Sequence, residues 1–257
     1  MSDSIKRPAI QSVSRAISIL RCFVGSRELG LSEISRMIGL HKSTTAGIIN
    51  TLKAEKFLEQ NEENGKFRLG IDLFCLAVNA KLELCDVCEP YLNSLLEATG
   101  ETVNLALRDG DSVVYVEKKE SPHSMRICTS VGKRLPLYCT AIGKAILAFL
   151  DEAEVLKLFD GLTLEQLTSN TITSKELLMA NLRAARKRGV AYDFEELEYG
   201  LICVAAPIFD KRGTPVGAVS VSGPSIRMNE QTRESIAGEL LKTAGAICQE
   251  ISRTAAL

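Results

Sequence analysis

Tryptophan does not occur in this chain of 257 residues, and histidine occurs only twice. The shortage of histidine bears on enzyme chemistry, because a nucleophilic serine or cysteine needs a neighbouring base, which histidine usually supplies. His41 and His123 stand far apart in the sequence, and His123 lies in a polar Ser-Pro-His-Ser stretch. The composition therefore gives little support to a small-molecule hydrolase, and we expect neither catalytic residues nor a cofactor.

Long apolar runs are missing as well. The first residues carry no apolar stretch of the kind found in signal peptides, and no segment approaches the ~20 apolar residues that cross a bilayer. The eight cysteines are scattered through apolar runs, so we expect reduced, mostly buried thiols rather than disulfides. These absences predict a cytoplasmic protein that does not contact a membrane.

The formal net charge is only −1, but the charges are unevenly distributed. Residues 1–70 contain 11 Lys+Arg and 7 Asp+Glu, a balance of +4, whereas the remaining residues contain 20 and 25, a balance of −5. A basic N-terminal part is suited to a polyanion, and an acidic remainder is not. The length allows two domains, so a nucleic-acid contact is expected in the first.

The segment 31–52, LSEISRMIGLHKSTTAGIINTL, has the pattern of two short helices joined by a tight turn. Apolar residues recur at helical spacing from Leu31, Ser32 is placed as a cap, and Gly39 can take the positive φ that ends a helix. The second helix is predicted to start near His41, and its first turn offers short polar side chains to phosphates and base edges. This layout is typical of a helix-turn-helix, although an ordinary helical hairpin has a similar pattern.

The segments on either side of this motif are also predicted to be helical. Residues 11–24 have a polar side with Arg15 and Arg21 and an apolar side with Val13, Ala16, Ile17, Leu20 and Phe23. A helical stripe also runs from residue 71 to about residue 84. This stripe can pack on the following domain or on a second copy of the chain. Packing on a second copy is favoured, because helix-turn-helix proteins usually bind paired half-sites.

A hairpin is predicted directly after the second helix of the motif. Two strand-like pieces in residues 57–69 flank Asn64-Gly65, a strong turn signal. Lys66 and Arg68 share one face, which can lie along a phosphate backbone as the wing of a winged helix. The predicted DNA-contacting residues are Arg15, Ser32, His41, Lys42, Ser43, Thr44, Thr45, Lys66 and Arg68.

The chain from about residue 86 has the pattern of a separate unit with both helices and strands. Strands are predicted at 102–107, 112–118, 125–130, 201–209 and 216–222, and helices at 90–99, at 141–188 with a break near 163–174, and at 230–252. The strands come in antiparallel-looking pairs with helices gathered between them. This order favours an α+β fold over a doubly wound parallel sheet.

Three blocks of sequence together resemble the IclR family of bacterial transcriptional regulators, and the similarity covers about residues 10–251. The blocks are GLHKST at 39–44, VGKRLPLYCTAIGKAILAFL at 131–150, and DFEELEYGLICVAAPIFD at 193–210 followed by VGAVSVSGP at 216–224.

The resemblance implies a winged helix-turn-helix DNA-binding domain at 10–70, a linker helix at 71–85 and a GAF-like effector-binding domain at 86–257. It also implies a homodimer or dimer of dimers on operator DNA. The expected function is that of a repressor of a catabolic operon, with a small organic or aromatic acid as its effector.

Carried onto this sequence, the family's effector pocket comprises Ser124, Ile127, Leu135, Ala141, Ile142, Asp193, Cys203, Ser220 and Ser222. The chemistry of these residues is reasonable for a ligand site. Ser220 and Ser222 are two apart on one predicted strand and so face the same side, and free N–H groups where a helix begins near Ala141 favour a carboxylate. Without the resemblance, local hydrogen bonds would explain the serines and core packing would explain Cys203.

The reading helix departs from the family in one place, because Thr45-Ala46-Gly47 stands where many members carry an arginine. The operator sequence is therefore not inferred. A winged helix that binds another protein instead of DNA stays open as an alternative, although the basic wing argues against it.

Two further motifs carry little functional weight. The segment 142–145 superficially resembles a nucleotide-binding loop but lacks its first glycine and the Ser/Thr after Lys144, so a structural lysine is expected. Cys85 and Cys88 have the spacing of half a metal site, but no second pair of ligands is evident, so no metal is predicted.

Overall fold

The computed structural model of this chain describes residues 10–79, 83–127 and 129–253. It divides into two compact units, Met1–Lys81 and Leu82–Leu257, and each has a hydrophobic core of its own. Residues 80–82, in the predicted linker helix, lie outside the described residues. Within the described ranges, no helix is long and apolar enough to span a membrane.

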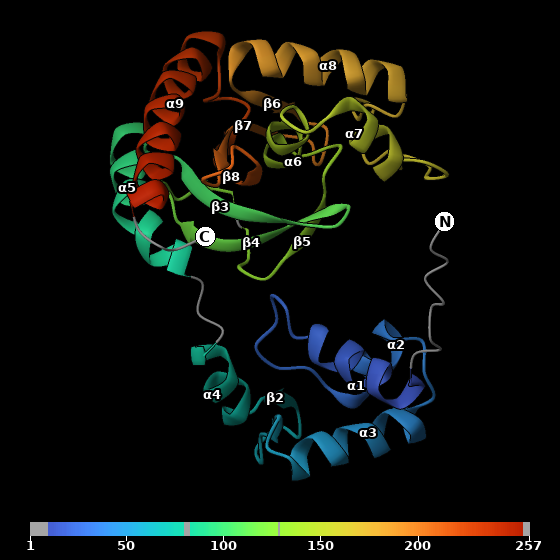
Figure 1. Cartoon of the computed structure of the whole chain (residues 1–257). Helices are drawn as coiled ribbons and strands as arrows, with labels where there is room; N and C mark the ends of the chain where they lie inside the picture. Colours follow the sequence, from blue (N-terminus) through green and yellow to red (C-terminus); the bar gives the residue numbers. More distant parts are fainter. Residues whose placement is uncertain (1–9, 80–82, 128, 254–257) are drawn as a thin grey trace. The chain divides into compact units, whose positions relative to one another are not determined.

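The N-terminal unit has the predicted helix-turn-helix followed by a two-stranded antiparallel hairpin (Figure 1). The elements are α1 (Gln11–Arg21), α2 (Leu31–Met37), α3 (Lys42–Ala54), β1 (Leu58–Gln60), β2 (Phe67–Leu69) and α4 (Ile71–Asn79). The helices α1, α2 and α3 and the hairpin share one core, to which they contribute Ile19, Ile34, Ile49 and Phe67.

The turn between α2 and α3 follows the sequence pattern, whereas the start of α2 does not. Gly39 takes a φ of +64°, as expected for a residue that ends a helix. The predicted cap at Ser32 is wrong, because α2 begins after Gly30, whose N–H donates to the carboxylate of Glu33 at 2.6 Å. Ser32 is instead an exposed residue inside the first turn.

The buried side of α1 agrees only in part with the predicted one. Phe23 is buried in the core, and Ala16 and Leu20 pack against it. Val13 and Ile17 are instead 53% and 44% exposed, and the core also takes Ile19 and Cys22. The helix has apolar residues on two sides, so periodicity alone did not indicate which side faces the core.

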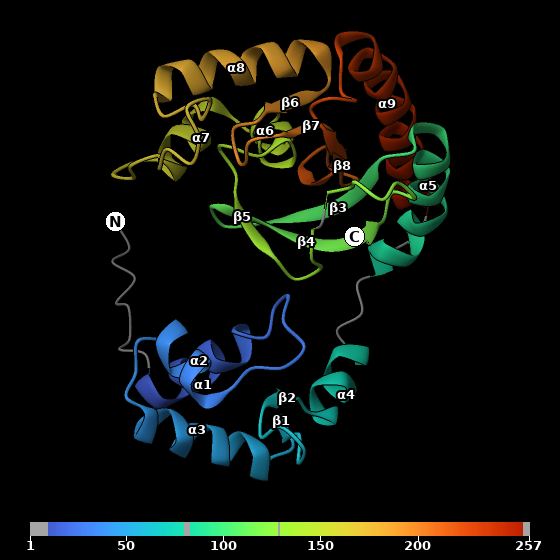
Figure 2. The ribbon, with the colours of Figure 1, turned by 180° about the vertical axis from the view of Figure 1, so that it is seen from behind.

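The C-terminal unit is built on one antiparallel sheet with the strand order β5-β4-β3-β8-β7-β6. Figures 1 and 2 show α5 and α9 on one side of the sheet and α6 on the other. The elements are α5 (Glu83–Thr99), β3 (Thr102–Asp109), β4 (Ser112–Lys119), β5 (Arg134–Pro136), α6 (Ala141–Leu147), α7 (Glu152–Leu158), α8 (Lys175–Arg188), β6 (Ala191–Phe194), β7 (Leu201–Phe209), β8 (Pro215–Pro224) and α9 (Glu230–Arg253).

This architecture confirms the predicted α+β fold. The long elements were predicted well, and α9 buries the apolar stripe expected from its periodicity, including Ile236, Leu240 and Ile247. The strand predicted at 125–130 is wrong for the described residues of that range, none of which is in a strand. The two short edge strands, β5 and β6, were not predicted, since three or four residues are too few to produce a recognisable alternation.

Candidate DNA-binding surface and ligand cavity

The first turn of α3 presents polar side chains to solvent. His41 precedes the helix, and Lys42, Ser43 and Thr44 form its first residues, all of them exposed. Because α3 is the second helix of the helix-turn-helix, this turn is the part that the motif offers to a DNA groove.

Thr45 does not belong to this surface, and its prediction as a DNA contact is corrected. Its side chain is fully buried, and its hydroxyl donates to the carbonyl oxygen of His41 at 3.1 Å. Thr45 precedes Ile49 by four residues and Leu52 by seven, so it shares their buried face. The exposed face continues instead from Ser43 to Asn50, a candidate that the same helical spacing indicates.

The wing carries its two basic side chains on the exposed surface. Lys66 is exposed, and Arg68 forms an ion pair with Glu59, the residue directly opposite it on β1, with an N–O distance of 2.9 Å. The turn is fixed to the rest of the unit by Asn61 and Asn64, whose amides donate to the carboxylate of Glu28 at 2.9 and 2.8 Å. Hydrogen bonding to Asn61 and Asn64 lowers the pKa of Glu28.

Of the remaining predicted DNA contacts, Arg15 is half-buried on α1 and Ser32 is exposed on α2. Neither lies on α3 or the wing.

Four neighbouring strands of the C-terminal unit each place one residue in a single row across the sheet. Thr102 of β3 is paired with Ser222 of β8, Ser222 with Cys203 of β7, and Cys203 with Asp193 of β6. Directly paired residues of antiparallel strands point to the same face. This polar row is therefore set by the register of the strands and lies on the face that α6 covers.

A cavity lies between this row and the segments that cover it. Eight of the nine predicted pocket residues line the cavity, whereas Ser124 is exposed and lies outside the lining. Leu135 belongs to the short edge strand β5. The lining residues are Tyr115, Ile127, Thr129, Lys133, Leu135, Thr140, Ala141, Ile142, Asp193, Leu197, Glu198, Leu201, Cys203, Ser220 and Ser222.

Seven of these lining residues were not selected from the sequence. The burial of Tyr115 and Val113 follows the alternation of β4, so this signal was present. Lys133, Leu197 and Glu198 come from segments between regular elements, where the sequence offers no periodic pattern.

Asp193 is the buried acid of the cavity. Its side chain is 1% exposed, and Oδ1 accepts the backbone N–H of Glu196 at 2.7 Å. Burial raises the pKa of Asp193 to about 7, although this hydrogen bond and the charge of Lys144 act in the opposite direction. Burial and the nearby Asp193 also raise the pKa of the Cys203 thiol, so Cys203 keeps its proton at neutral pH.

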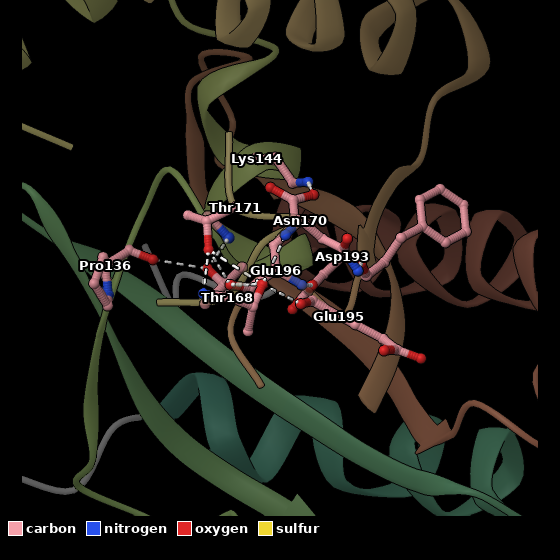
Figure 3. A network of polar contacts seen from close by, with 11 residues as sticks. Pro136, Lys144, Thr168, Asn170, Thr171, Asp193, Glu195 and Glu196 are labelled. Atoms are coloured by element: carbon pink, nitrogen blue, oxygen red, sulfur yellow. Dashed lines mark hydrogen bonds and ion pairs between the residues drawn. The ribbon is translucent and has the colours of Figure 1, made fainter. Parts of the chain in front are cut away.

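A buried ion pair holds the wall of the cavity next to Asp193 (Figure 3). Lys144 of α6 is fully buried and pairs with the carboxylate of Glu196. The hydroxyls of Thr168 and Thr171 donate to the carbonyl oxygens of Glu195 and Glu196 at 2.6 and 2.7 Å. Because Leu197 and Glu198 follow directly and line the cavity, this network fixes part of its wall.

These contacts give Lys144 the structural role expected of it. The described residues contain no group of three or more His, Cys, Asp or Glu placed to hold a metal ion. Cys88 is fully buried, and Cys85 of the same motif is half-buried on α5. No histidine is among the cavity-lining residues, so Cys203 lacks the base that a nucleophile requires.

Known proteins match this chain over nearly its whole length. Residues 12–62 match the IclR helix-turn-helix domain, and residues 76–249 match the bacterial transcriptional regulator IclR C-terminal domain. The HTH-type transcriptional regulator KdgR of Escherichia coli is 34% identical over 97% of this chain and 96% of its own length. The HTH-type transcriptional repressor AllR of E. coli is 33% identical over 94% of this chain and 90% of its own length.

A solved structure gives the same result. The crystal structure of the Thermotoga maritima IclR has a TM-score of 0.76 and 32% identity, and the match covers 95% of this chain and all of that one. These relatives are named as transcriptional regulators, in keeping with a helix-turn-helix joined to a second domain. The chain therefore belongs to the IclR family of bacterial transcriptional regulators.

Proposed function

We propose that this DNA-binding regulator is a repressor of a catabolic operon, and that a small organic or aromatic acid in its C-terminal cavity changes its affinity for operator DNA. The observation that carries the ligand part is the polar row from Thr102 to Asp193, of which Ser222, Cys203 and Asp193 line a cavity. Buried polar groups are costly unless they find partners, so a row of them beside free space suits a ligand.

The DNA part rests on two exposed surfaces of the N-terminal unit. Lys42, Ser43 and Thr44 suit base edges and phosphates in a major groove, and Lys66 and Arg68 suit the phosphate backbone. DNA phosphates would compete with Glu59 for Arg68, because that ion pair is exposed and therefore weak.

The double variant Lys66→Ala/Arg68→Ala tests the wing. We expect weaker binding to duplexes of any sequence, and a plot of log affinity against log salt concentration that is flatter by about 2, one for each lost phosphate contact. The measurement is fluorescence anisotropy with fragments from upstream of the protein's own gene. Lys157→Ala/Lys242→Ala removes two exposed charges from the C-terminal unit and serves as the control. Equal slopes for the two double variants would contradict the wing assignment.

The oligomer part of the proposal rests on α4. Ile71, Phe74 and Leu76 are 56%, 66% and 58% exposed on this short helix, an unusual amount of apolar surface to leave in water. A second copy of the chain would cover it and place two reading helices on paired half-sites.

The effector part follows from the chemistry of the cavity lining. Lys133 supplies a positive charge, and Tyr115, Thr129 and Thr140 supply hydroxyls. The lining is completed by Ser220, Ser222, Cys203, the acidic residues Asp193 and Glu198, and aliphatic side chains. We propose that the cavity takes a compact molecule with an acidic end and further polar groups. A ligand that binds one arrangement of the oligomer better than another would change the spacing of the reading helices.

A panel of small carboxylates and aromatic acids tests this part on the full-length protein. A true effector is expected to raise the melting temperature, because it binds the folded state, and to change DNA affinity at the same concentration. Ser220→Ala is expected to weaken both responses. An acid that is consumed during the assay would instead favour an enzyme.

A further inference from the structure

Asn104 lies beside the polar row but does not line the cavity. It is in β3, directly paired with Ser220 of β8, and its side chain is 1% exposed. Its amide nitrogen donates to Oγ of Ser222 at 3.3 Å and to Oγ of Ser220 at 3.5 Å. One asparagine therefore contacts both of the serines that line the cavity.

The other end of the same amide has no partner. Oδ1 of Asn104 is one of three buried side-chain atoms without a hydrogen bond in the part of the chain that the structure describes. Burying an unpaired acceptor is unfavourable. The buried amide of Asn104, with only its nitrogen hydrogen-bonded, therefore requires an explanation.

The explanation lies in what the amide does to the serine hydroxyls. A serine hydroxyl has one hydrogen to donate and two lone pairs that accept. When Asn104 donates to the serine oxygens, the serine hydrogens stay free for the cavity. Cys203 and Ser222 also form a side-chain hydrogen bond. In its contact with Asn104, Ser222 accepts, and its hydrogen is not used there.

We infer that Asn104 is a positioning residue that holds the hydroxyls of Ser220 and Ser222 as a pair of donors, which receive the carboxylate or a keto oxygen of the effector. This inference rests on the proposed function, since it states which end of the ligand lies at the serines. Two O–H donors on the same face of one strand match the two oxygens of a carboxylate. The reverse arrangement, with the serines donating to Asn104, would offer only oxygens and would select a ligand hydroxyl or amine.

Neutron diffraction from the deuterated full-length protein without ligand tests the arrangement directly, because it locates the deuterium atoms. We expect the Nδ2 deuterons of Asn104 to point at the two serine oxygens and the serine deuterons to point into the cavity. Serine deuterons directed at Oδ1 of Asn104 would overturn the inference, whatever the protein binds.

Ligand selectivity provides the second test. The probes are 4-hydroxybenzoate and gluconate, each compared with its primary amide by calorimetry. The variant Asn104→Leu keeps the size of the side chain and removes its amide group. Its affinity for an acid that binds the parent protein is expected to fall about tenfold, and its affinity for the primary amide of that acid is expected to fall less.

Asn181→Leu is the matched control, because Asn181 of α8 also has a buried, unpartnered Oδ1 and does not line the cavity. It is expected to keep the acid-to-amide ratio of the parent. An unchanged ratio in Asn104→Leu would overturn the inference. If neither acid binds the parent protein, the proposed effector class fails for these compounds, and the neutron result still decides the orientation of the serines.

Discussion

Replacing Lys144 by methionine is expected to destabilise the C-terminal unit strongly. Methionine keeps the unbranched chain and removes the charge, so the carboxylate of Glu196, which is 5% exposed, loses its only charged partner among the described contacts. Its second oxygen, Oε2, already has no hydrogen bond. Breaking a buried ion pair in this way typically costs about 3–5 kcal/mol, a large share of the stability of an ordinary domain.

Urea unfolding followed by tyrosine fluorescence measures this loss in the full-length protein. The chain has no tryptophan, and all five tyrosines lie in the unit Leu82–Leu257, so the signal reports that unit alone. The double variant Lys144→Met/Glu196→Leu removes both charges and is expected to recover most of the loss.

Arg183→Met serves as the control, because it breaks an exposed ion pair. The side chains of Arg183 and Glu152 are 62% and 50% exposed, so the free energy of unfolding is expected to fall by less than about 1 kcal/mol. The reasoning is refuted if Lys144→Met unfolds at the same urea concentration as the parent. It is also refuted if the double variant is no more stable than the single one.

Three further predictions concern titration, packing and assembly. Because burial raises the pKa of Asp193 to about 7, the unfolded chain releases this proton at lower pH, and the unit should lose stability as pH rises from about 4 to about 7. The side chain of the variant Asp193→Asn cannot ionise, so the melting temperature of the variant should exceed that of the parent by more and more as the pH rises over this window. A constant difference would contradict the raised pKa of Asp193. Gly143→Ala should destabilise the C-terminal unit by about 1–3 kcal/mol in thermal melts, because the added Cβ would lie 2.1 Å from the carbonyl oxygen of Leu137. Gly47→Ala is the contrasting case. Its added Cβ meets open space, so this change should stabilise α3 by up to about 1 kcal/mol. Phe74→Asp should reduce the sedimentation coefficient by splitting the oligomer, and an unchanged coefficient would exclude α4 from the interface.

The sequence predicted the features that depend on neighbouring residues. The periodic apolar residues of α2, α3 and α9, the positive φ of Gly39 and the Asn64-Gly65 turn are all decided within a few positions along the chain. Local backbone preferences and side-chain spacing act at this range, so they can be read directly. The resemblance to a family added most of the cavity residues, which periodicity alone did not select.

Only the tertiary structure decided which side chains meet across the fold. Thr44 and Thr45 are adjacent residues of the same type, yet Thr44 is exposed and Thr45 is buried. Thr45 lies on the buried face of α3 together with Ile49. The pairing of Lys144 with Glu196 joins residues 52 positions apart, and the contact of Asn104 with Ser222 joins residues 118 apart. Such contacts depend on strand order, register and the approach of covering segments, which are set by burial over the whole domain and leave no local pattern.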